Sequence, residues 1–246
     1  MKDYNNESQI PLPIYLNAEE EQSMATFMVA DSNSKAFNCL NSLLEDGVLN
    51  KGTFLYMYGE TGCGKSHLLK STYKKAIDLK LDSIILNLSE WLEFDPASLL
   101  SGIVENYDVI CLDNIDSVAG NNDWESELFA LFNRWLTKES GLLLVTSKFS
   151  QTLSKFSKQE FVTRLQSGIT LHINTATNEL MQEILVSREK MRGGILTYEL
   201  AKTIVDKLKS LPVCLDALKQ IDELALEHKK PLNKTMVMTV LRKRNN

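Results

Sequence analysis

The segment from Gly59 to Ser66 constrains the fold of this chain more than any other feature. It reads Gly-Glu-Thr-Gly-Cys-Gly-Lys-Ser, fits the pattern G-x4-G-K-[ST], and lies between an apolar run at 54–58 and a helical pattern at 68–77. In such a strand–loop–helix unit, the glycines let backbone N–H groups approach a phosphate closely, and the helix N-terminus adds partial positive charge. An ordinary glycine-rich turn is the alternative, but the flanking strand and helix disfavour it. We therefore expect a nucleotide-phosphate site in which Lys65 bridges the β- and γ-phosphates and Ser66 holds Mg²⁺. The predicted site consists of Gly59, Glu60, Thr61, Gly62, Cys63, Gly64, Lys65 and Ser66.

A second apolar run, at 108–113, ends in an acid. Four apolar residues precede Asp113, which is expected to hold Mg²⁺ through water at the end of a strand. A buried strand that ends in Asp is common, so this motif only supports the site. The next residue is Asn114, where an active ATPase of this kind needs an acid to activate the attacking water. Because an amide cannot accept that proton, we expect weak ATP hydrolysis by this chain alone. The alternative is that another acid, such as Asp116, substitutes.

Periodicity divides the chain into three regions. Residues 1–22 are polar, contain two prolines and predict an extended tail. Residues 23–174 alternate short apolar runs with amphipathic helical patterns, which predicts an α/β domain with a parallel sheet covered on both faces. Residues 175–246 show helical periodicity without strands and predict a helical lid subdomain, with N-caps near Thr177 and at Asn233. The expected strands are 53–58, 83–88, 108–112, 141–146 and 169–173.

Composition and charge place the chain among ordinary globular proteins. Its 246 residues are 43% hydrophobic and 24% charged, and no apolar run approaches the about 18 residues that cross a bilayer. The first residues lack an apolar leader pattern and the four cysteines are far apart, so we expect a cytoplasmic protein without membrane contact. The net charge of −5 arises within residues 1–31, which hold six acids and one lysine. The balanced remainder disfavours a protein that holds nucleic acid through phosphates alone.

These motifs resemble the AAA+ class and, within it, the initiator DnaA and its shorter relatives, the Hda-type regulatory inactivators of DnaA. The resemblance runs over nearly the whole chain and is most specific at 111–120 (Cys-Leu-Asp-Asn-Ile-Asp-Ser-Val-Ala-Gly), 124–125 and 132–134. A non-acidic Asn after the strand-ending Asp is also typical of Hda-type proteins. The resemblance implies an AAA+ base with a helical lid, and ADP or ATP with Mg²⁺ as cofactors.

The resemblance also implies contacts to the adenine ahead of the phosphate loop. The segment 27–33 (Phe-Met-Val-Ala-Asp-Ser-Asn) is similar to the family segment that packs around the base, so Phe27 and Val29 are expected there. His67 directly follows the phosphate loop and is counted with the nucleotide-site positions. The side chain of His67 itself is expected on the helix surface or in packing.

Two further functional positions follow from the resemblance. Thr146 or Ser147 ends a strand where AAA+ proteins place the residue that faces the γ-phosphate. Arg164, within Phe-Val-Thr-Arg-Leu at 161–165, matches the arginine finger. A finger guanidinium crosses a subunit interface and stabilises charge on a neighbour's transferring phosphate. The alternative for Arg164 is an ordinary surface arginine on a helix.

One position departs from the family pattern. The lid residue that usually carries a second sensing arginine corresponds to about Pro212 in this chain. Lys209 or Arg188 would have to supply that charge instead.

The tail contains a short apolar peptide with two prolines. Residues 9–14 read Gln-Ile-Pro-Leu-Pro-Ile and resemble the peptide with which Hda-type proteins bind the replicative sliding clamp. A proline-stiffened segment loses little entropy on docking, and its apolar side chains would fill a pocket while Gln hydrogen-bonds at the rim. The alternative is an arm that folds onto its own core. The predicted clamp contacts are Gln9, Ile10, Leu12, Pro13 and Ile14.

Two functions of different classes follow. The resemblance implies a negative regulator of replication initiation that binds the DNA-loaded clamp, meets DNA only through it, and presents Arg164 to ATP on DnaA. The alternative is a helicase-loader-like ATPase that acts on single-stranded DNA, which would need appreciable turnover of its own. An initiator fragment is disfavoured, since the tail peptide stands where an initiator carries an N-terminal domain. Homo-oligomers are possible under either function.

Overall fold

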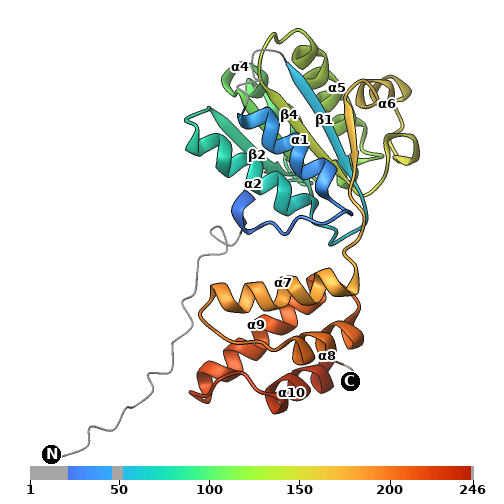
Figure 1. Cartoon of the computed structure of the whole chain (residues 1–246). Helices are drawn as coiled ribbons and strands as arrows, with labels where there is room; N and C mark the ends of the chain where they lie inside the picture. Colours follow the sequence, from blue (N-terminus) through green and yellow to red (C-terminus); the bar gives the residue numbers. More distant parts are fainter. Residues whose placement is uncertain (1–21, 46–51, 245–246) are drawn as a thin grey trace, which may run out of the picture. The chain divides into compact units, whose positions relative to one another are not determined.

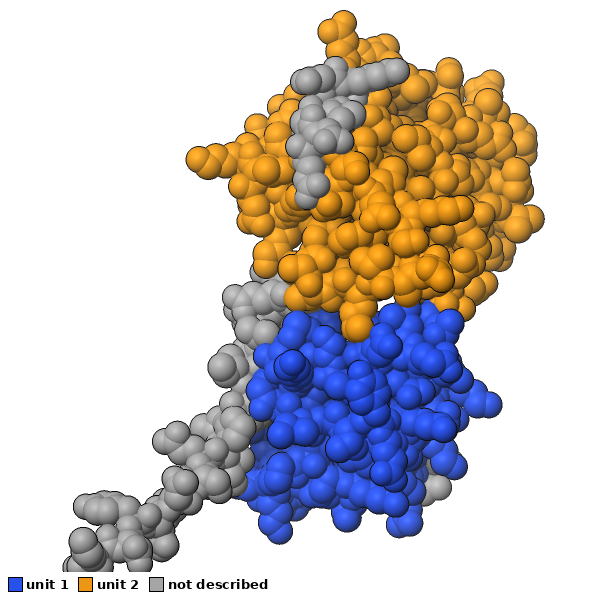
Figure 2. Space-filling model, viewed as in Figure 1, with its two compact units in different colours: residues 1–21, 176–246 blue, residues 22–175 orange. Residues whose placement is uncertain are grey.

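The computed structural model describes residues 22–45 and 52–244. These residues divide into two compact units, 22–175 and 176–244 (Figure 2). The predicted clamp peptide at 9–14 lies outside the described residues. None of the helices within the described ranges is long and apolar enough to cross a membrane.

Within the described residues, unit 22–175 contains a five-stranded parallel sheet in the order β2-β3-β4-β1-β5 (Figure 1). Leu55 of β1, an interior strand, lies opposite Leu144 of β4 on one side and Ile169 of β5 on the other. Every predicted strand is present, and each end lies within one residue of its predicted position. The strands are β1 Thr53–Tyr58, β2 Ser83–Asn87, β3 Val109–Asp113, β4 Leu142–Ser147 and β5 Ile169–His172.

Both faces of the sheet are covered by helices, which explains the continuous apolar runs of the central strands. Leu55 and Met57 of β1 belong to the core under α1 and α2. Phe54 and Tyr56 point to the opposite face and belong to the core under α5 and α6. The predicted fold class, an α/β parallel sheet of the AAA+ type with C-terminal helices, is confirmed. The helices of this unit are α1 Ser34–Glu45, α2 Lys65–Asp78, α3 Pro96–Leu100, α4 Ile103–Asn106, α5 Asn122–Leu136 and α6 Gln159–Leu165, with the short 3-10 turns η1 Met24–Thr26, η3 Leu88–Glu90, η4 Ile115–Val118 and η5 Gln151–Leu153.

Unit 176–244 consists of α7 Asn178–Met191, α8 Tyr198–Leu208, α9 Leu211–Glu227 and α10 Lys234–Arg244. Both predicted N-caps form, because the Thr177 side chain accepts the N–H of Leu180 and the Asn233 side chain accepts that of Met236. The apolar faces of the four helices share one core.

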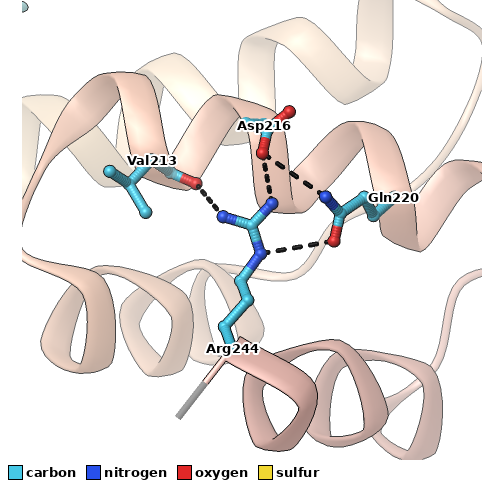
Figure 3. A network of polar contacts seen from close by, with 4 residues as sticks. All are labelled: Val213, Asp216, Gln220 and Arg244. Carbon is cyan, nitrogen blue, oxygen red and sulfur yellow. Dashed lines mark hydrogen bonds and ion pairs between the residues drawn. The ribbon is translucent and has the colours of Figure 1, made fainter. Parts of the chain in front are cut away.

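The last turn of α10 is fastened to α9 by Arg244 (Figure 3). Its guanidinium pairs with Asp216, donates to Oε1 of Gln220 at 3.3 Å and donates to the carbonyl of Val213 at 3.4 Å. A planar guanidinium has donors in a fixed fork, so these three acceptors set the position of α10 along α9.

Candidate functional site

The glycine-rich loop joins β1 to α2, as the pattern predicts. Gly64 is the N-cap of α2 and has φ +107°, in the left-handed region that glycine adopts without strain. Gly59 opens the loop, and a Cβ there would lie 2.2 Å from the carbonyl oxygen of Ile173. The loop therefore needs glycine at position 64 for its backbone conformation and at position 59 because the Ile173 carbonyl lies too close for a side chain.

Lys65 begins α2 and turns its side chain into the loop. Its ammonium donates to the carbonyl of Gly59 at 2.7 Å and to that of Glu60 at 3.0 Å, and the residue is buried. The Sγ atom of Cys63 lies 3.8 Å from the same nitrogen. Burial raises the pKa of the Cys63 thiol and outweighs the opposing effect of Lys65. The loop thus carries one positive charge and a protonated thiol.

The strand-ending acid and the residue predicted to sense the γ-phosphate contact each other. Thr146, at the end of β4, donates its hydroxyl proton to Oδ1 of Asp113, at the end of β3. The same hydroxyl accepts the backbone N–H of Asn114 at 3.0 Å. All three residues lie where neighbouring parallel strands end, which is where ligands of open α/β sheets bind.

Asn114 is held by a network that the sequence pattern did not reveal. Its backbone has φ +56°, a conformation that Asn tolerates better than most residues. Its amide donates to Oδ1 of Asn87 at 2.9 Å, and the amide of Asn87 donates to Glu90 at 2.6 Å. Asp116, the alternative acid, accepts the backbone N–H of Lys148 at 2.9 Å. The side chain that follows Asp113 is thus an amide fixed by another amide.

Phe27 lies against the loop from the N-terminal side. Its ring stacks on Phe37 with centroids 5.7 Å apart and meets His67 edge-on at 5.1 Å. A Cβ on Gly64 would lie 3.3 Å from the Phe27 ring. Val29 is 46% exposed, so its side chain is available at the surface beside this aromatic group. His67 therefore packs against Phe27, which is one of the two positions expected for its side chain, and its place in the nucleotide site stays a prediction.

Arg164 lies on α6 with its side chain exposed. No hydrogen bond or ion pair engages its guanidinium within the described part of the chain. The neighbouring Phe161 and Leu165 are fully buried. The helix thus has one face in the core and carries its arginine on the other.

The positions predicted in the helical lid lie in unit 176–244. Arg188 is on α7 and is buried. Lys209 ends α8 with φ +54°, and Pro212 lies in the first turn of α9, where proline fits a helix. All three positions belong to unit 176–244, and the role of each stays a prediction.

Comparison with known proteins places this chain among the DnaA-like ATPase domains. A family model described as the bacterial DnaA ATPase domain matches residues 18–172, more than half of the chain. An uncharacterized protein from Haemophilus influenzae is 28% identical over 95% of this chain and 98% of its own length. The replication initiator DnaA of Buchnera aphidicola is 26% identical over 94% of this chain, which spans only 55% of that initiator.

The fold is also similar to that of a solved DnaA domain. Domain III of the Thermotoga maritima replication initiation protein DnaA superposes with a TM-score of 0.78 at 18% identity, over 91% of this chain and 96% of that one. The likeness covers more residues than the family model does. The chain therefore belongs to the family of bacterial DnaA ATPase domains.

Proposed function

We propose that the chain is a nucleotide-bound regulator of replication initiation, of the Hda type, that stimulates hydrolysis of ATP on DnaA. In this function Arg164 enters the nucleotide site of a neighbouring DnaA molecule and stabilises charge on the transferring phosphate. Residues 9–14 hold the chain on the DNA-loaded sliding clamp. The observation that carries the proposal is the exposed guanidinium of Arg164, which has no partner in the described residues, on a helix whose other face is buried.

The chain is also expected to bind a nucleotide of its own. The loop at 59–66 binds the phosphates of ADP or ATP, with Phe27 and Val29 beside the base. Ser66 and Asp113 offer a hydroxyl and a carboxylate, the oxygen donors that Mg²⁺ takes when phosphates complete its shell. One oxygen of Asp113 receives Thr146, while Oδ2 has no hydrogen bond or ion pair within the described residues and is available to a cation. Turnover of this nucleotide is slow, because Asn114 cannot accept a proton.

The proposal is tested by steady-state ATP hydrolysis with DnaA, DNA-loaded clamp and this chain. Arg164→Ala is expected to lower the stimulated rate on the order of 10³-fold, the usual effect of losing an arginine finger. Lys202→Ala removes an exposed positive charge from α8 and serves as the matched control, with wild-type stimulation. Undiminished stimulation by Arg164→Ala would remove the finger from the proposal.

The tether is tested separately by clamp pull-down. The Gln9→Ala, Leu12→Ala double variant is expected to lose clamp binding because it removes the rim hydrogen bond and one apolar anchor. Its nucleotide affinity is expected to stay unchanged. If the intact chain fails to bind the clamp, the proposed role of residues 9–14 is wrong. Rapid turnover of ATP by the chain alone, together with binding of single-stranded DNA, would instead favour the loader-like ATPase.

A further inference from the structure

The helix that carries Arg164 begins without a cap of its own. Lys158 is the N-cap residue of α6 and its side chain makes no capping hydrogen bond. The acceptor comes instead from α5, where the Glu125 carboxylate receives the backbone N–H of Ser157 at 2.9 Å and that of Lys158 at 2.9 Å. Glu125 also accepts the N–H of Gly120 at 2.8 Å. A distant carboxylate thus fixes the start of α6.

The end of α6 is fixed by a second buried polar side chain. Gln151, in η5, donates through Nε2 to the carbonyl of Leu165 at 3.3 Å and to the hydroxyl of Thr170 at 2.7 Å. Leu165 is the last residue of α6 and follows Arg164 directly, while Thr170 belongs to β5. Gln151 therefore ties the C-terminal end of the finger helix to the edge strand of the sheet.

Packing alone would hold α6 less specifically. Phe161 meets Phe132 and Phe156 edge-on, with centroids 5.4 Å and 4.9 Å apart. Aromatic packing is tolerant of small rotations, whereas hydrogen bonds at both ends of a two-turn helix fix its rotation and its position along the axis.

Glu125 connects two segments that are far apart in the sequence, the turn at Gly120 and residues 157–158. It is fully buried, and within the described residues no ion pair compensates its charge. Its carboxylate is instead satisfied by the backbone N–H groups of Gly120, Ser157 and Lys158, which would lose their acceptor if the carboxylate were removed. Its bonds to the two residues that directly precede α6 fix the place where this helix starts.

We propose that Glu125 and Gln151 are positioning residues that orient α6 and thereby aim Arg164 at the neighbouring nucleotide. This inference rests on the proposed function, because it assigns these residues to the finger. Neither side chain touches the nucleotide; both act through the backbone of α6. A shift of about 1 Å in a catalytic group lowers a rate on the order of 10²-fold, so loss of either tether lowers the stimulated rate without removing the guanidinium.

The test uses Glu125→Gln and Gln151→Met, which conserve size while removing charge or donor. The matched controls are Glu127→Gln, also on α5, and Gln166→Met, directly after α6. Neither side chain forms a hydrogen bond with α6. The maximal rate of DnaA-bound ATP hydrolysis is expected to fall at least about tenfold in both test variants. The concentration for half-maximal stimulation is expected to stay within about twofold of wild type, because the docking surface is intact. Adding Arg164→Ala to Glu125→Gln is expected to cost less than it does in wild type.

Hydrogen exchange of the amides in α6 gives a readout that needs no partner. Both test variants are expected to exchange faster at 159–165 than wild type, with unchanged exchange in β1 and β4. Wild-type stimulation and exchange in both test variants would overturn the inference. A rate loss that follows global unfolding, measured as a melting temperature below the assay range, would also overturn it.

The two hypotheses fail in different ways. A wild-type chain that stimulates nothing overturns the proposed function itself. An active wild type, with an inactive Arg164→Ala and a fully active Glu125→Gln, overturns only the positioning role.

Discussion

In the proposed function, Asn114 limits the rate at which this chain hydrolyses its own nucleotide. Its backbone occupies the left-handed region, and its amide bonds Asn87 where an acid would have to hold the attacking water. Asp is the acid that fits this backbone best, because Asn and Asp both tolerate φ > 0 better than longer side chains do. Glu would add strain at the same position.

Asn114→Asp is therefore expected to raise the intrinsic ATP turnover of the chain by about tenfold or more, since a positioned general base is worth on the order of 10²–10⁴. Turnover is measured on the isolated chain with ATP and Mg²⁺. Asn122→Asp in the exposed first turn of α5 adds the same charge away from the site and is expected to change nothing. Equal turnover in wild type and Asn114→Asp would show that the amide is not what limits hydrolysis.

Local motifs identify some site residues, and long-range polar contacts hide others. Lys65 and Asp113 stand in patterns whose spacing is set by one loop or one strand, so the sequence predicts where they lie. Asn87, Glu125 and Gln151 bond partners 14 to 33 residues away, which no local pattern encodes. Glu125 did leave a signal, because it stands three residues before Leu128 on the apolar stripe of α5. An acid at a core position is a reason to look for buried backbone donors.

At the level of elements, a buried acid couples two helices of the C-terminal unit. Glu189 of α7 is 4% exposed and lies beside Asp222 of α9, which pairs with Arg192 at 2.7 Å. Burial and the charge of Asp222 raise the pKa of Glu189 to about 8, against the opposing effect of Arg192. The folded chain therefore holds Glu189 protonated at neutral pH.

This shift makes stability depend on pH with a definite sign. The pKa of Glu189 is higher in the folded chain than in the unfolded chain, so this group contributes its full stabilisation of the folded state below about pH 4.5. That stabilisation is lost as the pH rises to about 8. Glu189→Gln mimics the neutral acid and is expected to remove this loss, so the variant should exceed wild type by more than about 1 kcal/mol near pH 8. Chemical denaturation at pH 5 to 9 measures it. Glu183→Gln, exposed on the same helix, is the control, and a Glu189→Gln profile parallel to wild type would contradict the shift.

The sequence predicts the boundaries of elements that are buried throughout or that bury one regular face. The interior strands β3 and β4 are buried throughout, so their apolar runs mark them directly, and the long amphipathic helices α2 and α5 show the helical period. The short elements α3, α4 and η1 were not predicted. Each spans five residues or fewer, which is too short for a period to appear.

At the scale of the whole molecule, the proposed functions lie on different parts of the chain. The proposed clamp peptide is residues 9–14, the phosphate loop follows β1, and the proposed finger Arg164 is on α6. Under the proposed function, this chain acts on a neighbour's nucleotide more than on its own.

The most direct measurement is single-turnover hydrolysis of labelled ATP preloaded on DnaA, after free nucleotide is removed and clamp-loaded DNA is added. The wild-type chain is expected to convert the DnaA-bound ATP to ADP, and the Arg164→Ala chain is expected to leave it as ATP over the same time. Conversion at the same rate with both chains would contradict the central claim that Arg164 acts in trans.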